Sequence, residues 1–100
     1  MNAIISSVGQ PLFTLGQIVS TPGALDALKT ADVTARGLLL RHWSGDWGDL
    51  CAEDKLENDL SVQQGYRILS AYRLPHTGVT VWIITEADRS VTTLLLPDDY

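Results

Sequence analysis

Residues 66–96 read YRILSAYRL-PHTG-VTVWIIT-EADRS-VTTLLL, and this stretch decides the fold. Its apolar residues recur at every second position, which is the period of a β-strand. We therefore predict three strands, over residues 66–74, 79–85 and 91–96. The PHTG segment joins the first two strands as a tight hairpin turn, and EADRS joins the second pair.

The middle strand is apolar on both of its faces. Val81 and Ile83 point to one side, and Trp82 and Ile84 point to the other. A strand of this kind is expected to be central and at least partly covered on both sides. An antiparallel meander gives the middle strand that position.

Two short helices are predicted upstream. Thr21 and Pro22 are a good helix start, so we expect a helix over residues 22–30. Asp32 is able to cap a second helix, although residues 38–40 also fit a short buried strand. We favour the helix, despite a cost of about 1 kcal/mol for the glycine within it. This helix would carry Ala35, Leu38, Leu39 and His42.

A third helix is predicted after the glycine-rich turn at residues 44–49. It begins near Asp46 or Asp49, either of which is a suitable N-cap, and it ends at Gly65. An i, i+4, i+8 row is expected to face inward, and a row of acids to face outward. The inward row is Ala52, Leu56 and Leu60, and the outward acids are Glu53, Asp54 and Glu57.

The expected architecture is a single α+β domain over residues 1–100. Two or three helices pack on one face of a three-stranded antiparallel sheet. A short strand within residues 13–19 would add a fourth, and residues 1–12 read as a loose N-terminal arm.

Composition limits the class of protein. The chain has 100 residues, of which 45% are hydrophobic and 19% charged, as in ordinary globular domains. The single cysteine, Cys51, excludes an internal disulfide and a cysteine-cluster zinc site. Neither a secretory signal nor a membrane span is recognisable, so we expect a cytoplasmic protein that binds no membrane. The net charge of −5 argues against direct nucleic-acid binding, which needs a basic face.

Three blocks of sequence resemble a known family: RHWSGDWGD (41–49), GYRILSAY (65–72) and WIITEADRS (82–90). The family consists of proteins of about this length, often carried on plasmids and other mobile elements of proteobacteria. They bear labels such as "plasmid-related protein" or a restriction-subunit name. The similarity runs over residues 15–100, and it implies a genomic neighbourhood rather than a mechanism. No glycine-rich fingerprint follows a strand, so a cofactor-binding methylase is not expected.

His42 is the one candidate for acid–base chemistry. A histidine oriented by a carboxylate can act as a general base, and Asp46 and Asp49 lie close by in the sequence. Glu86 and Asp88 would have to join them through the fold. The sequence contains no metal-binding histidine spacing, so neither a metal nor a cofactor is expected. We favour a structural role for His42 at the end of its helix.

Candidate binding residues fall into two groups. The paired tryptophans, Trp43 and Trp47, are either an exposed binding site or anchors in the core, and we favour the core. The acids form either a solvated helix face or a negative patch aimed at a basic partner. These acids are Asp46, Asp49, Glu53, Asp54 and Glu57.

The sequence therefore favours a small acidic, non-enzymatic binding protein of a mobile element. Its partner would be a protein with a basic surface, and counter-defence against CRISPR or restriction systems is the role we expect. A small hydrolase or nuclease built around His42 is one alternative. A toxin-like, RNA-cleaving domain is another, although such domains are usually basic.

Overall fold

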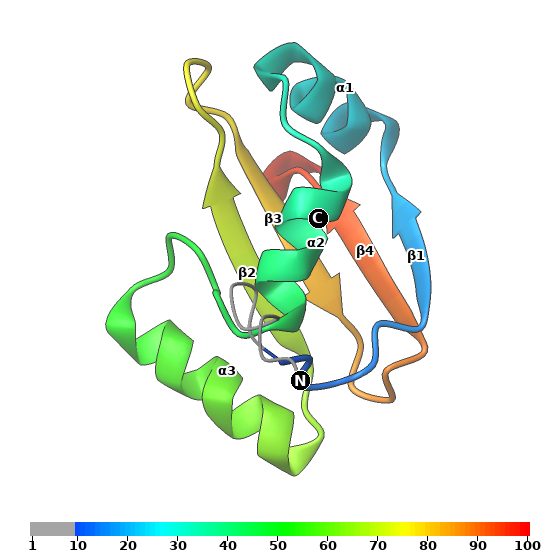
Figure 1. The fold of residues 1–100 in the computed structure, drawn as a ribbon, viewed down its shortest axis with the longest axis vertical. Coiled ribbons are helices and arrows are strands. Elements are labelled where there is room, and N and C mark those ends of the chain that lie inside the picture. Colours follow the sequence, from blue (N-terminus) through cyan, green and yellow to red (C-terminus); the bar gives the residue numbers. More distant parts are fainter. Residues whose placement is uncertain (1–9) are drawn as a thin grey trace, which may run out of the picture.

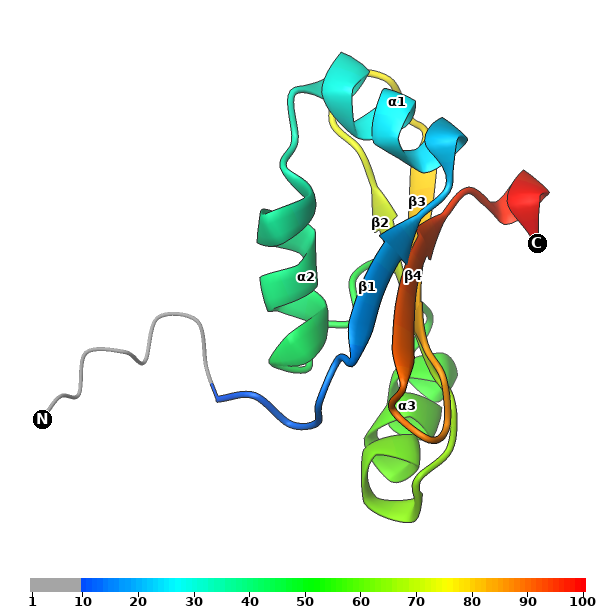
Figure 2. The ribbon, with the colours of Figure 1, turned by 90° about the vertical axis from the view of Figure 1, so that its right-hand side faces the viewer.

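The computed structural model describes residues 10–100 and folds them into an α+β domain (Figure 1). The elements in chain order are β1 (Gln17–Ser20), α1 (Pro22–Ala31), α2 (Ala35–Trp43), α3 (Ala52–Gln64), β2 (Ile68–Arg73), β3 (Thr80–Thr85), β4 (Val91–Leu95) and a final 3-10 turn, η2 (Pro97–Asp99). Figure 2 shows α1 and α2 on one face of the sheet and α3 near one end of it. The three helices and the three predicted strands are confirmed.

The sheet has the order β1-β4-β3-β2, so β3 is central as predicted. Strands β2, β3 and β4 form an antiparallel meander, but β1 runs parallel to β4. The expectation of a purely antiparallel sheet is therefore wrong for this fourth strand. Three helices lie between β1 and the meander along the chain. No hairpin turn therefore requires β1 to run antiparallel to the strand beside it.

The segment before β1 is held in place rather than loose. The N–H of Leu12 donates to the carbonyl of Trp43 at 3.0 Å. The prediction of a loose arm over residues 1–12 is therefore wrong at Leu12. Residues 1–9 of that arm lie outside the described residues. Gly16 has φ 66°, and a Cβ there would stand 2.3 Å from the carbonyl oxygen of Ser90. The chain therefore needs glycine at this close approach, and β1 begins only after it.

The helix caps follow the sequence in part. The Thr21 side chain accepts the N–H of Ala24 at 3.2 Å, as its position predicted. The second helix is capped by Thr34, which accepts the N–H of Gly37, and not by Asp32. Asp32 instead ends α1 in the left-handed conformation, with φ 57°. Residues 38–40 lie within α2, so the strand alternative is excluded.

The main core lies between the sheet and the helices α1 and α2. Its buried members are Ala24, Leu28, Ala31, Leu38, Tyr72, Leu74, Val81, Ile83 and Leu94. On the opposite face, Ile84 and Leu95 are buried and Trp82 is half buried. The Trp82 ring meets Tyr100 edge to face, with 5.9 Å between ring centroids. Both faces of β3 are thus at least partly covered, as its sequence predicted.

Helix α3 turns a different face to the protein than expected. Leu56 and Leu60 are 67% and 46% exposed, so the predicted inward row is wrong. The buried residues of α3 are Asn58 and Ser61. Figure 1 shows the reason, because α3 lies beside β2 at the edge of the sheet and not over its face. An edge presents backbone N–H and C=O groups, which require polar partners.

The bounds of α3 also differ at one end. The helix begins at Ala52 after Cys51, which makes no side-chain cap, and not near Asp46 or Asp49. Both aspartates use their carboxylates elsewhere in the loop, as described below. Gly65 ends the helix with φ 77°, as predicted.

Candidate functional site

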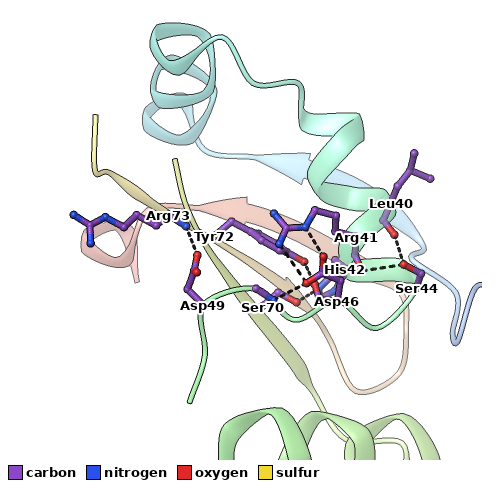
Figure 3. Close-up of polar contacts among 10 residues, drawn as sticks. Leu40, Arg41, His42, Ser44, Asp46, Asp49, Ser70, Tyr72 and Arg73 are labelled. Atoms are coloured by element: carbon purple, nitrogen blue, oxygen red, sulfur yellow. Dashed lines mark hydrogen bonds and ion pairs between the residues drawn. The ribbon is translucent and has the colours of Figure 1, made fainter. Parts of the chain in front are cut away.

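The loop between α2 and α3 is held by an ion pair at its start (Figure 3). Arg41 Nε donates to Asp46 Oδ2 at 2.6 Å, and Arg41 Nη2 donates to Asp46 Oδ1 at 3.2 Å. The same Oδ1 accepts the N–H of Gly48. The hydrogen bond from Arg41 lowers the pKa of the Asp46 carboxyl, since it stabilises the charged form. Asp46 is therefore engaged in shaping the loop.

The next part of this loop pairs with the outer edge of β2. The N–H of Asp49 donates to the carbonyl of Ala71 at 2.7 Å, and the N–H of Ala71 donates to the carbonyl of Trp47 at 3.2 Å. The Asp49 carboxylate accepts the N–H of Arg73 at 2.7 Å (Figure 3). A Cβ on Gly48 would stand 2.0 Å from the Ala71 oxygen, so this pairing requires glycine.

Asn58 of α3 completes the same edge. Its Nδ2 donates to the carbonyl of Leu69 at 2.7 Å, and its Oδ1 accepts the N–H of Leu69 at 3.2 Å. The outward N–H groups of Leu69, Ala71 and Arg73 and the outward carbonyls of Leu69 and Ala71 are thus bound by the loop and by α3. We call this side of the sheet the capped edge.

His42 is fully buried and lies in a row of hydroxyl groups. Its Nδ1 is 2.6 Å from Ser70 Oγ, and its Nε2 is 2.9 Å from Thr85 Oγ1. The row continues from Thr85 to Thr92 Oγ1 at 2.7 Å, and from Thr92 to the carbonyl of Leu15 at 2.7 Å. We call this set the buried polar row.

Hydrogen counting fixes the tautomer of His42. A hydroxyl has one proton, and that of Thr92 goes to the Leu15 carbonyl, which only accepts. Thr85 must therefore donate to Thr92, and so it accepts from His42 Nε2–H. The remaining Nδ1 accepts from Ser70 Oγ–H. Burial lowers the pKa of His42 to about 3, so the ring is neutral at physiological pH.

The catalytic grouping around His42, which was the alternative to the structural role that we favour, does not form. Both of its ring nitrogens are bound to hydroxyls, and its ring packs edge-on against Phe13 and Trp47. The four carboxylates each have other partners. Asp46 binds Arg41, Asp49 binds the Arg73 N–H, Glu86 lies 3.9 Å from Arg67, and Asp88 accepts from Ser90. His42 is a structural residue of the core.

The two tryptophans have different environments. Trp47 is 4% exposed and donates its Nε1–H to Asp59 at 3.0 Å, so it is an anchor in the core, as the favoured alternative predicted, and not an exposed binding residue. Trp43 is half buried and donates to the carbonyl of Phe13 at 2.7 Å. One side of Trp43 lines an apolar hollow between β1 and α2. Trp43 remains a binding candidate.

The outer surface of α3 keeps the predicted acids exposed. The carboxylates of Glu53, Asp54 and Glu57 make no hydrogen bond or ion pair within residues 10–100, although the Glu57 carbonyl accepts from Ser61 Oγ. Leu56 and Leu60 lie among them, and with Glu53 and Glu57 they line a shallow hollow of about 300 Å³. We call Glu53, Asp54, Leu56, Glu57 and Leu60 the acidic–leucine face.

Sequence reasoning missed two anchoring residues. The first is Asn58. Asn58 and Ser61 lie three residues apart and form a polar stripe, which marks the inward face of α3. The second is Arg89. It donates to the carbonyls of Ser61 at 2.9 Å and Tyr66 at 2.6 Å, where a cation stabilises the C-terminal end of α3.

Within residues 10–100, no group of three or more His, Cys, Asp or Glu side chains is placed to hold a metal ion. No helix in that part of the chain has the length and apolar character needed to cross a bilayer. No family model, curated protein or solved structure matches the chain. The resemblance to proteins of mobile elements therefore stays a prediction.

Proposed function

We propose that this chain is a non-enzymatic binding protein that acts through protein–protein contact. Its contact surface is the acidic–leucine face of α3, and its partner presents basic side chains around an apolar patch. The partner chemistry follows from the surface, since the acids attract cations and the leucines require apolar contact.

The observation that carries this proposal is the exposure of Leu56 and Leu60. One helical turn separates them on α3, and they are 67% and 46% exposed. Removing apolar surface from water is favourable by about 25 cal/mol per Å², so a partner that covers both leucines gains binding energy. Glu53 and Glu57 flank the leucines without partners of their own within residues 10–100.

The proposed biological setting is counter-defence on a mobile element, with a restriction or CRISPR complex as the basic partner. This setting rests on the sequence resemblance alone. The enzymatic alternatives receive no support from the site, because His42 is buried and the carboxylates predicted to help it bind other groups.

The test is capture of a partner from the native host with the tagged full chain, followed by mass spectrometry. We expect the double variant Glu53→Lys with Glu57→Lys to lose the partner while keeping the wild-type circular dichroism spectrum. The matched control is Asp26→Lys with Asp98→Lys. It changes the net charge equally at two other exposed sites and should retain the partner.

Two further results sharpen the test. Replacing Leu56 and Leu60 by serine should also abolish capture, because the apolar centre of the surface is lost. Added salt should weaken the complex, since exposed charges are screened over about 8–10 Å at ordinary ionic strength. Capture that survives both double variants of α3 would overturn the proposal.

A further inference from the structure

The outer edge of β1 has backbone groups that meet no partner within residues 10–100. The N–H groups of Gln17 and Thr21 donate to the carbonyls of Ser90 and Leu94 on the β4 side, at 2.9 and 3.0 Å. Because hydrogen-bonding direction alternates along a strand, the N–H and C=O groups of Ile18 and Ser20 point outward. None of them is bound within residues 10–100. Figure 1 shows β1 as the outermost strand on this side.

An apolar hollow of about 420 Å³ lies beside this edge, between β1 and α2. It is lined by Leu15, Ile18, Arg36, Leu39, Leu40 and Trp43. Ile18 is 49% exposed, and the other apolar residues contribute partly buried side chains. We call the outward edge of β1 and this hollow the open edge.

We propose that the open edge binds an extended peptide segment of another protein as a fifth strand. The peptide pairs with the outward groups of Ile18 and Ser20 and places a large apolar side chain in the hollow. An acidic residue of the peptide lies near Arg36.

The backbone geometry selects an extended peptide. Free N–H and C=O groups at every second residue are matched by another β-strand, and not by a helix or a small molecule. Side chains of a strand alternate between the two faces, so every second side chain of the added strand lies on the α2 side, over the hollow. Strand addition thus supplies affinity through the main chain and selectivity through the hollow.

The charge of Arg36 indicates that the bound peptide carries an acidic residue. Arg36 is exposed and makes no ion pair within residues 10–100, so it is available to a carboxylate. A second copy of this chain is the less favourable occupant, because it would bring a further net charge of −5. This surface belongs to β1 and α2, whereas the proposed function uses α3 beside β2. The two proposals therefore fail or succeed independently.

The experiment selects displayed random dodecapeptides on the immobilised full chain and synthesises those that are enriched. Their affinities are then measured by calorimetry. We expect peptides with alternating apolar positions and at least one acid. Amide exchange followed by NMR should show new protection at Ile18 and Ser20 in the complex. The Val19 amide, which faces β4, should be unaffected.

Matched variants locate the contact. Ile18→Pro removes one outward N–H and should weaken binding about tenfold or more, whereas Val19→Ala, on the opposite face of the sheet, should not. Leu40→Glu should weaken binding through the hollow, which keeps the test valid if the proline variant fails to fold. Glu53→Lys with Glu57→Lys should bind these peptides normally.

Three results would overturn the proposal. The first is failure to enrich any peptide. The second is enriched peptides that bind without protecting the Ile18 and Ser20 amides. The third is a dimer of the free chain in sedimentation that Ile18→Pro dissociates, which would make a second copy the occupant.

Discussion

At the capped edge, the outward N–H groups of Leu69, Ala71 and Arg73 and the carbonyls of Leu69 and Ala71 are bound by Asp49, Asn58 and the backbone of the loop. At the open edge, those of Ile18 and Ser20 have no partner within residues 10–100. Unpaired edges promote association with other chains, and proteins usually block them. The loop and α3 block the edge of the sheet at β2. The edge at β1 is therefore the one available for a further strand.

The buried polar row connects these two sides. It begins at Ser70 on β2, passes through His42, Thr85 and Thr92, and ends at the Leu15 carbonyl just before β1. Burying a polar group is costly unless it is hydrogen-bonded, and every member of the row has a partner. The row therefore fixes the segment before β1 against the meander.

The largest expected effect breaks the capped edge. Trp47→Ala should lower the free energy of unfolding by about 3–5 kcal/mol, because it empties a buried site beside His42 and Phe13. Ile18→Ala, on the half-exposed open edge, should cost less than about 1.5 kcal/mol. Urea unfolding measures the free energy of unfolding of both variants. Circular dichroism of the backbone is the signal, because it does not depend on tryptophan. Equal costs would mean that the two edges contribute alike to stability.

A second prediction concerns Asn58, which binds both backbone groups of Leu69. Asn58→Ala should cost about 2–4 kcal/mol, because it leaves one donor and one acceptor unpaired beside a partly covered strand. Asn58→Asp keeps an acceptor for the Leu69 N–H but turns a charged oxygen toward the Leu69 carbonyl, so at neutral pH it should cost at least as much as alanine. A cost below 1 kcal/mol for the alanine variant would show that water replaces the side chain at this edge.

Most of the fold could be predicted from local patterns. The period of two in residues 66–96 gave the meander, and Thr21, Pro22 and Gly65 gave helix ends, because these signals act within a few residues. The parallel direction of β1 could not be predicted, since its partner β4 is more than 70 residues away. A four-residue strand carries no pattern that distinguishes the two directions.

The face of α3 shows a different limit. A helical period shows which residues share a face, but it does not show what that face meets. The leucine row was assigned inward because a sheet face needs apolar partners. The helix lies at an edge instead, where Asn58 binds backbone groups and the leucines remain outside. The candidate partners of His42 were likewise chosen from acids nearby in the sequence. Its actual partners, Ser70 and Thr85, are distant in the sequence.

The third prediction tests the buried polar row through pH. The folded-state pKa of His42 is about 3, below the value of about 6.5 expected in the unfolded chain. The unfolded state therefore binds an extra proton between these values, and stability falls as the pH is lowered through this range. The slope is about 1.4 kcal/mol per pH unit, or about 2 kcal/mol between pH 6.5 and 5.

Urea unfolding at pH 7, 6 and 5 measures this slope, and His42→Gln serves as the control that should lack it. Because His42 stays neutral in the folded state, the NMR shift of its Cε1–H should remain constant from pH 8 to 5. A ring that titrates near pH 6 in the folded protein would contradict the burial that lowers its pKa.

The smallest expected effect concerns the ion pair that starts the capped edge. Asp46→Asn removes the charge but keeps an oxygen for the Gly48 N–H, so it tests the pairing with Arg41 alone. Both side chains are about half exposed, so the cost should be under about 1 kcal/mol and should shrink in high salt. The lowered pKa of Asp46 means that this contribution is present at neutral pH and is lost on acidification. Asp46→Ala also frees the Gly48 N–H and should cost more. If the two variants cost the same in urea unfolding, the carboxylate does not hold the loop that pairs with β2.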